Sequence, residues 1–187
     1  MPAATLTRDE VIDRLMLAFR RHGYAEASLS ELSKATGLGK SSLYHYFPNG
    51  KEDMMRAVLE WLASKLRAEV FEPLGGAGTP KRRLDRMIRS LDLFYKGGRE
   101  ACLLGNLVVG ETRDRFHRPL AAIFEEWIEA VAATLREAGY SRVVARSRAA
   151  DAVIRIEGAL VLAGAFGDAT LFERTLAQLG KELLAPA

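Results

Sequence analysis

The side chains best equipped for recognition chemistry gather in one short stretch, between Lys40 and Phe47. They offer hydroxyl groups, an imidazole ring and an ammonium group, and the stretch contains no carboxylate. Leu43 and Phe47 are four residues apart, so on a helix they share one apolar face and leave the polar side chains on the other. The polar set is Lys40, Ser41, Ser42, Tyr44, His45 and Tyr46. A short helix with this surface suits the major groove of DNA, where such groups contact base edges and phosphates.

The residues before this stretch predict a second short helix and a tight turn. Ser28, with Glu31 three residues later, forms a capping box that begins the first helix. Gly37 suits the left-handed conformation that ends this helix. Pro48 ends the second helix, because proline lacks the N–H that a further turn needs. The second helix is too short to be stable alone, so packing of its apolar face must hold it in place.

This block resembles the helix-turn-helix of the TetR family of bacterial transcriptional repressors. The similarity is greatest at Leu43-Tyr44-His45-Tyr46-Phe47 followed by Lys51, and it covers roughly the first third of the chain. The segment Pro48-Asn49-Gly50-Lys51 is one residue longer than the commonest family form.

The resemblance also implies roles for individual side chains. It implies phosphate contacts for Ser28 and Tyr46, and another for Lys51 near the start of the next helix, where the helix N-terminus also favours an anion. The groove-facing residues that it implies are Lys40, Ser41, Ser42, Tyr44 and His45. Taken alone, these residue types are explained better by a solvated face on a packing helix.

The rest of the sequence predicts helices and no strands. A capping box of Thr7 and Glu10 opens a helix that braces the helix-turn-helix from behind. Thr79-Pro80 is a strong helix start, and Thr170 with Glu173 predicts another capping box. Later helices are expected over residues 50–71, 80–96, 101–109, 116–138, 142–166 and 170–184.

The predicted fold class is therefore all-α, with about nine helices. A three-helix head forms a helix-turn-helix DNA-binding domain at residues 1–50, and residues 51–187 form a larger ligand-binding and dimerisation domain.

Polar residues inside apolar runs suggest a ligand pocket in the larger domain. Asn106, Arg155 and Glu157 lie in such runs, and buried polar groups need partners from a ligand, a dimer interface or the chain itself. Asp151 precedes Arg155 by four residues, so an intrahelical ion pair explains Arg155 about as well. The candidate ligand-binding residues are Met87, Leu91, Phe94, Tyr95, Asn106, Phe124, Trp127, Ile128 and Arg155. For the apolar members, plain core is the competing explanation.

Composition and motifs exclude other classes. The chain has 187 residues, 49% of them hydrophobic and 27% charged, which is typical of a globular protein. Its net charge of +3 is modest, so contacts to DNA must come from local placement of charge. The three histidines have no metal-ligand spacing, and no phosphate loop or nucleophile motif is present, so we expect neither an enzyme nor a cofactor.

The expected compartment is the cytoplasm. The single cysteine, Cys102, excludes an intrachain disulfide, and the first residues lack the basic and apolar regions of a signal peptide. The most apolar stretch, residues 149–166, is interrupted by Asp151, Arg155 and Glu157, so we expect no membrane span.

The sequence thus predicts a ligand-responsive DNA-binding transcriptional regulator, a repressor that a small apolar or aromatic inducer releases from a palindromic operator. The resemblance implies a homodimer through the last two long helices, which brings two heads to one operator. It also implies that the inducer shifts the helices expected at 101–109 and 50–71. Two alternatives remain: a helical DNA-binding protein without a small-molecule ligand, and a thiol or electrophile sensor acting through Cys102. The apolar neighbours of Cys102 favour a buried structural residue over the sensor.

Overall fold

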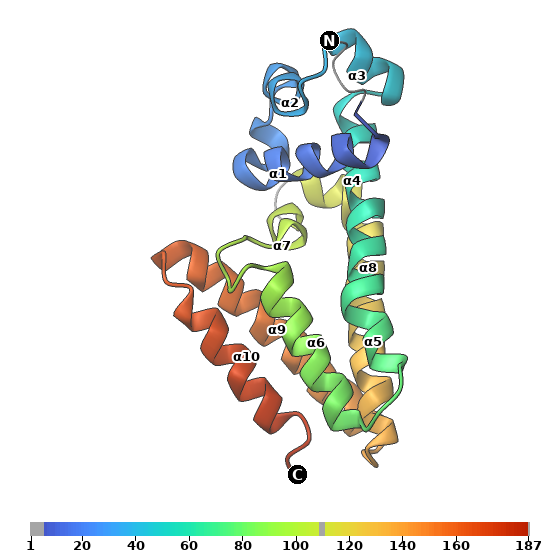
Figure 1. Cartoon of the computed structure of the whole chain (residues 1–187), viewed down its shortest axis with the longest axis vertical. Helices are drawn as coiled ribbons and strands as arrows, with labels where there is room; N and C mark the ends of the chain where they lie inside the picture. The colour runs from blue at the N-terminus through green and yellow to red at the C-terminus, as the bar shows by residue number, and fades with distance from the viewer. Residues whose placement is uncertain (1–5, 109–110, 187) are drawn as a thin grey trace. The chain divides into compact units, whose positions relative to one another are not determined.

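The computed structural model describes residues 6–108 and 111–186, and in these ranges the chain forms helices and no strand (Figure 1). The all-α prediction is confirmed. The main helices are α1 (Arg8–Glu26), α2 (Leu29–Thr36), α3 (Lys40–Tyr46), α4 (Lys51–Leu66), α6 (Pro80–Phe94), α7 (Leu103–Leu107), α8 (Glu111–Glu137), α9 (Arg142–Phe166) and α10 (Thr170–Glu182). The end expected for α7 at residue 109 lies outside the described residues.

The helices group into two compact units. The head unit comprises Met1–Ser64 together with Asn106–His117, and the body unit comprises Lys65–Gly105 together with Arg118–Ala187. This division differs from the boundary predicted after residue 50, because most of α4 and a distant segment of the chain belong to the head unit.

Local signals in the sequence set the helix ends of the head unit. The Thr7 hydroxyl accepts a hydrogen bond from the Glu10 N–H, and the Glu10 carboxylate accepts one from the Thr7 N–H at 2.8 Å, which completes the predicted capping box. At Gly23 the backbone leaves the helical conformation, with φ 74° and ψ 166°, and a short further turn follows to Glu26.

The helix predicted over residues 50–71 is divided into two segments, and a short third one follows it. After α4 the turns widen into a π-helix, η1 (Arg67–Phe71), and then tighten into α5 (Glu72–Gly75). Pro73 occupies the first turn of α5.

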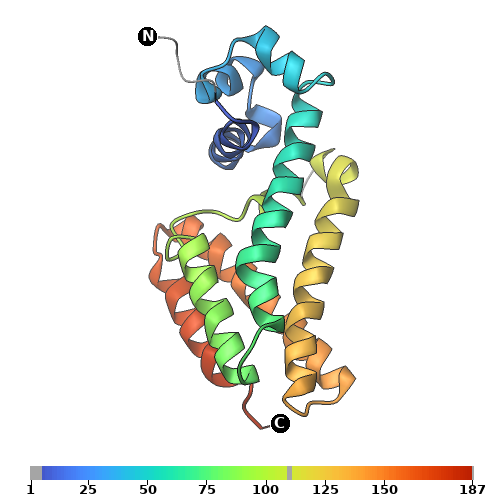
Figure 2. The same cartoon turned by 45° about the vertical axis from the view of Figure 1, so that its right-hand side comes forward.

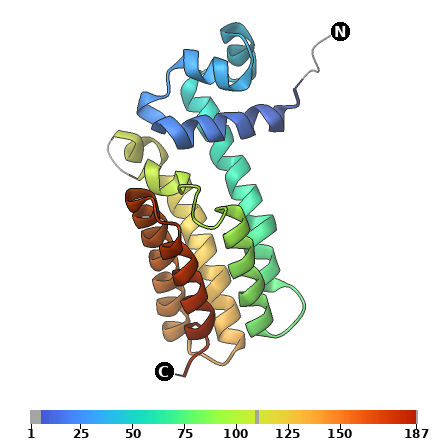
Figure 3. The same cartoon turned by 60° about the vertical axis from the view of Figure 1, so that its left-hand side comes forward.

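The core of the body unit is built around α9 and α10. These two helices run antiparallel side by side, and α6 lies next to α10 (Figures 2 and 3). Their buried residues include Ala149, Ile156, Leu160, Phe172, Leu176 and Leu179. Gly98 has a φ of 85°, and a Cβ atom there would lie 2.6 Å from the Phe172 Cβ, so only glycine permits this approach.

The start of α10 differs from the prediction. The expected capping box of Thr170 and Glu173 is wrong, because Thr170 lies inside the helix rather than before it. Asp168 serves that end instead: its Oδ1 accepts hydrogen bonds from the Thr170 N–H at 3.0 Å and from the Thr170 hydroxyl at 2.7 Å. These bonds lower the pKa of the Asp168 carboxyl. Among the described helices, none has the length and apolarity needed to cross a membrane.

Candidate functional site

Local signals fix the start of α2 and the turn that leads from α2 to α3. Glu31 Oε2 accepts from the Ser28 N–H at 2.7 Å, which lowers the pKa of Glu31, and the Ser28 hydroxyl accepts from the Glu31 N–H at 3.2 Å. Gly37 then adopts the left-handed conformation, with φ 73°. The predicted capping box and left-handed end of α2 are therefore both present.

Two residues that sequence reasoning missed also hold this turn. The buried Thr36 hydroxyl donates to the Leu32 carbonyl at 2.8 Å and accepts from the Leu38 N–H at 3.3 Å. Arg14 of α1 donates to the Thr36 carbonyl at 2.9 Å. Local sequence offers no signal for the Arg14 contact, because it joins residues of different helices.

The two faces of α3 separate as the spacing predicts. Leu43 and Phe47 are 0% and 2% exposed, so they anchor the helix in the head unit. Ser42 is partly exposed, and the remaining predicted DNA-contacting side chains of α3 are exposed: Lys40, Ser41, Tyr44, His45 and Tyr46. The segment Lys40–Tyr46 presents hydroxyl, imidazole and ammonium groups with no carboxylate among them. Such a surface is chemically suited to base edges and phosphates.

Ser28 and Lys51 occupy the ends of neighbouring helices. Ser28 is exposed at the N-terminus of α2. Lys51 is the first residue of α4, but its ammonium group already has partners within the head unit. It donates to the Ala25 carbonyl at 3.0 Å and lies 4.8 Å from the centre of the Tyr24 ring. Lys51 therefore ties the end of α1 to the start of α4, a role that the sequence did not suggest.

The segment Asn106–His117 contributes a second set of contacts to the head unit. The buried Phe116 ring meets the Tyr24 ring edge-on at 5.2 Å, and the guanidinium of Arg56 lies 5.7 Å from the Phe116 ring centre. Arg115 pairs with Glu52 at 3.1 Å. Hydrogen bonds from Arg56, and then from Arg115, lower the pKa of Glu52. Arg115 and Glu52 are 63 residues apart, so sequence reasoning missed them.

Most residues of the predicted ligand set are core residues in the structure. Met87, Leu91, Tyr95 and Trp127 are fully or almost fully buried, and the partly buried members are Phe94, Phe124 and Ile128.

The two polar members of that set are Asn106 and Arg155, and neither is an unpartnered buried group. Asn106 is exposed and belongs to the head unit, so the expectation that it is a buried polar group is wrong. Arg155 pairs with Glu182 of α10 at 2.7 Å and with Asp151 at 3.7 Å, which supports the ion-pair explanation.

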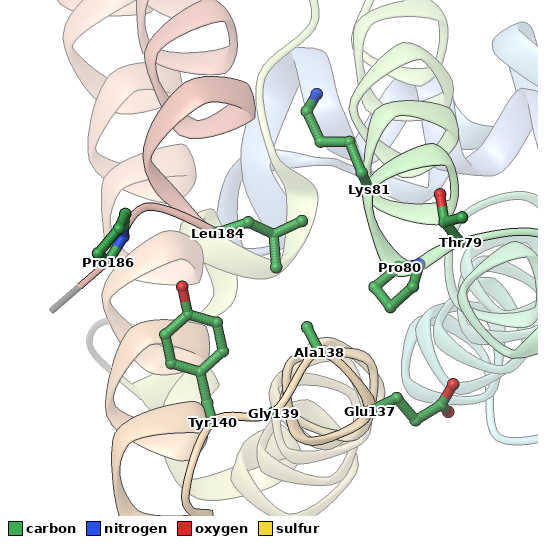
Figure 4. Close-up of a pocket in the computed structure, with 9 residues that line it drawn as sticks. All are labelled: Thr79, Pro80, Lys81, Glu137, Ala138, Gly139, Tyr140, Leu184 and Pro186. Carbon is green, nitrogen blue, oxygen red and sulfur yellow. The ribbon is translucent and has the colours of Figure 1, made fainter.

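An open pocket of about 540 Å³ lies at one end of the body unit (Figure 4). It is lined by Thr79, Pro80, Lys81, Glu137, Ala138, Gly139, Tyr140, Leu184 and Pro186, and by none of the predicted ligand residues. Its polar groups are already engaged: the Thr79 hydroxyl caps α6, Lys81 pairs with Asp85, and the Tyr140 hydroxyl donates to the Ala185 carbonyl at 2.7 Å. Nothing in its lining therefore calls for a ligand.

Cys102 lies in a buried polar cluster of the body unit. The Tyr95 hydroxyl donates to Cys102 Sγ at 3.5 Å. Burial, and then the neighbouring Glu157 carboxyl, raise the pKa of the Cys102 thiol to about 12. The thiol is therefore protonated at neutral pH. The thiolate is the reactive form, so this environment argues against the sensor alternative.

Both halves of the chain match families of known regulators. Residues 12–58 match the family described as bacterial regulatory proteins, tetR family, and residues 81–178 match the C-terminal domain of LmrA/YxaF-like transcriptional regulators. The transcriptional regulator AcuR of Cereibacter sphaeroides is 31% identical over 144 residues, which cover 73% of this chain and 64% of that protein. The matched region thus spans slightly less than two thirds of AcuR.

Solved structures show the same fold. A TetR transcriptional regulator from Legionella pneumophila has a TM-score of 0.82 at 22% identity, covering 97% of this chain and 98% of that one. A cysteine variant of the TetR-family regulator CifR, solved with a 26bp double-strand operator DNA, has a TM-score of 0.73 at 21% identity over 100% of both chains. Together with the two matched domains and the geometry of α2 and α3, these similarities show that the chain belongs to the TetR family of transcriptional regulators.

Proposed function

We propose that this protein is a transcriptional regulator that binds an operator through α3. The observation that carries the proposal is the division of α3 into a buried face, Leu43 and Phe47, and an exposed polar face free of carboxylates. The family consists of transcriptional regulators and not of enzymes. CifR, which shares the fold, binds a double-strand operator DNA. A regulator of this kind acts on DNA in the cytoplasm, and repression is the mode that we propose.

Selection of bound fragments from the source genome tests this function. The purified protein is expected to enrich a small set of palindromic sequences. Lys40→Ala, which removes the only cation of α3, is expected to weaken binding to these sequences roughly tenfold or more. Lys181→Ala, which removes an exposed cation at the end of α10, is the matched control. Equal affinities for both variants would contradict the assignment of α3.

The predicted phosphate contact of Lys51 has a structural competitor, its bond to the Ala25 carbonyl. The two roles differ in salt dependence. A lost phosphate contact weakens binding to all sequences and lowers the slope of log affinity against log salt by about one. We propose the phosphate role, and Lys51→Ala tests it. Weaker binding with an unchanged slope would leave only the structural role.

We propose that two copies pair chiefly through α9. Its outward side carries large apolar side chains, among them Ile154 and Phe166 with exposures of 68% and 70%. Gly158 lies four residues after Ile154 on the same side and would allow close approach of another helix. The exposed residues of α10 are mostly polar. This pattern supports the predicted dimer and gives α9 the larger share of the interface.

Analytical ultracentrifugation tests the dimer. Ile154→Asp places a charge in the proposed interface and is expected to produce monomers that no longer bind a palindromic operator tightly. Ala122→Asp, at an exposed position of α8, introduces the same charge outside both helices of the predicted interface and is expected to leave the dimer intact. A dimer that survives Ile154→Asp would place the interface elsewhere.

We further propose that an inducer acts on the head through residues 106–117. This segment packs in the head unit, yet it falls within the region matched by the C-terminal domain family. Its Phe116 and Arg115 contact Tyr24 of α1 and Glu52 of α4. A change in this segment would therefore alter the elements that support α3. Typical coupling between two sites is about 1–3 kcal/mol, or roughly 5- to 150-fold in operator affinity.

A further inference from the structure

The carboxyl group of Glu157 is a buried polar group without a hydrogen-bond partner. Both of its oxygens are inaccessible to solvent, and neither has a partner among the described residues. Glu157 lies on α9, and the interaction of its carboxyl with the Cys102 thiol lowers its pKa by less than burial raises it. Buried polar atoms are paired in the great majority of native structures, so such a group calls for an explanation.

Within residues 6–108 and 111–186, no cation forms an ion pair with this carboxyl. The Cys102 sulfur accepts a hydrogen bond from the Tyr95 hydroxyl, and the Tyr95 ring packs edge-on against Phe172 at 5.8 Å. Besides Cys102, no titratable group affects the pKa of Glu157, which burial raises to about 7. The buried guanidinium of Arg83 in the same unit, by contrast, pairs with an exposed carboxylate, that of Glu137.

Gly105 explains how the carboxyl can be buried at this place. A Cβ atom on Gly105 would lie 3.2 Å from Glu157 Oε2, which is tighter than an ordinary contact. Because Gly105 has no side chain, its backbone can lie close to this carboxylate oxygen. Alanine at this position would compete for space with any group that approached the oxygen.

We propose that Glu157 is the anchor for a small organic cation, an apolar or aromatic molecule that carries a protonated amine. An ammonium group supplies several N–H donors to the two unpartnered oxygens and neutralises their charge, and the aromatic pair of Tyr95 and Phe172 is joined to this cluster through Cys102. The inference rests on the proposed function, since it names the chemical class of the inducer.

Benzylamine, with benzyl alcohol and benzoate as matched probes, tests the proposal by calorimetric titration of the full-length protein. Benzylamine is expected to bind, and Glu157→Gln to weaken its binding roughly 10- to 100-fold, as loss of a charged hydrogen bond would. Gly105→Ala is expected to weaken it as well. Gly75→Ala is the control, because a Cβ atom there meets nothing within 4 Å.

Several results would overturn the proposal: no binding of benzylamine, equal binding to wild type and Glu157→Gln, or tighter binding of benzyl alcohol or benzoate. Gly105→Ala provides an independent reading if the Glu157→Gln variant does not fold. Operator binding by the protein without added amine is measured first. If that binding is absent, the proposed function fails. If it is present and benzylamine does not bind, only the anchor role of Glu157 fails.

Discussion

Replacing Glu157 by glutamine is expected to change how the stability of the protein depends on pH. In the folded chain burial raises the pKa of Glu157 to about 7, from an ordinary value of 4.5. The folded state therefore holds this proton more tightly than the unfolded chain does. Its stabilising contribution is complete below pH 4.5 and is lost as the pH rises through 7. Relative to low pH, where the group is protonated in both states, the free energy of unfolding is lower by about 3 kcal/mol at pH 8. At pH 5 it is lower by about 1 kcal/mol.

Glu157→Gln removes this dependence, because the amide does not titrate. Relative to wild type, the variant is expected to gain about 2 kcal/mol between pH 5 and pH 8. For a chain of this size that gain corresponds to about 4–8 °C in melting temperature. The unpaired amide has its own cost, but that cost is the same at every pH. The informative quantity is therefore the change with pH and not the absolute difference.

Thermal unfolding followed by circular dichroism measures this effect. The protein concentration is kept constant, since dimer formation makes the melting temperature depend on it. Glu60→Gln, at an exposed position of α4, controls for the general effect of removing a negative charge. A difference between wild type and Glu157→Gln that is constant from pH 5 to pH 8, or that favours wild type more as the pH rises, would refute the reasoning.

Three further substitutions test the packing that supports the two units. Leu43→Ala is expected to destabilise α3 by about 2–5 kcal/mol and to abolish operator binding; amide hydrogen exchange of α3 checks this, and unchanged protection would contradict it. Phe116→Ala is expected to cost about 3–5 kcal/mol and to weaken operator binding in a gel-shift assay, although residue 116 is distant in sequence from the helix-turn-helix. Gly98→Ala is expected to lower stability by about 1–3 kcal/mol in urea unfolding, because its Cβ would lie 2.6 Å from that of Phe172; wild-type stability would show that α10 can move aside.

The features that the sequence predicted well depend on residues close together in the chain. The capping box of Ser28 and Glu31, the left-handed Gly37 and the two faces of α3 all involve neighbours within one or two helical turns. In such cases the spacing alone determines which groups meet.

The contacts that were missed connect distant parts of the chain. The tie from Lys51 to Ala25 and the meeting of Phe116 with Tyr24 depend on tertiary packing, which spacing does not report. Asn106 was expected to be buried because its neighbours are apolar, but α7 has only five residues and exposes this side chain. A polar residue in an apolar run can therefore be either exposed or buried. Asn106 is exposed, whereas both carboxylate oxygens of Glu157, which lies in the same kind of run, are inaccessible to solvent.

The head unit is assembled from two separate stretches of the chain, and this affects how it can be made and exchanged. A ribosome completes the first stretch well before it reaches Phe116, so during synthesis Tyr24 lacks the ring that later covers it. Chimaeras that graft this head onto the body of a relative need residues 106–117 as well as residues 1–64. A graft that carries only the first stretch would lack the ion pair of Glu52 with Arg115 and the contact of the Tyr24 ring with Phe116. We expect α3 to be poorly supported in such a graft.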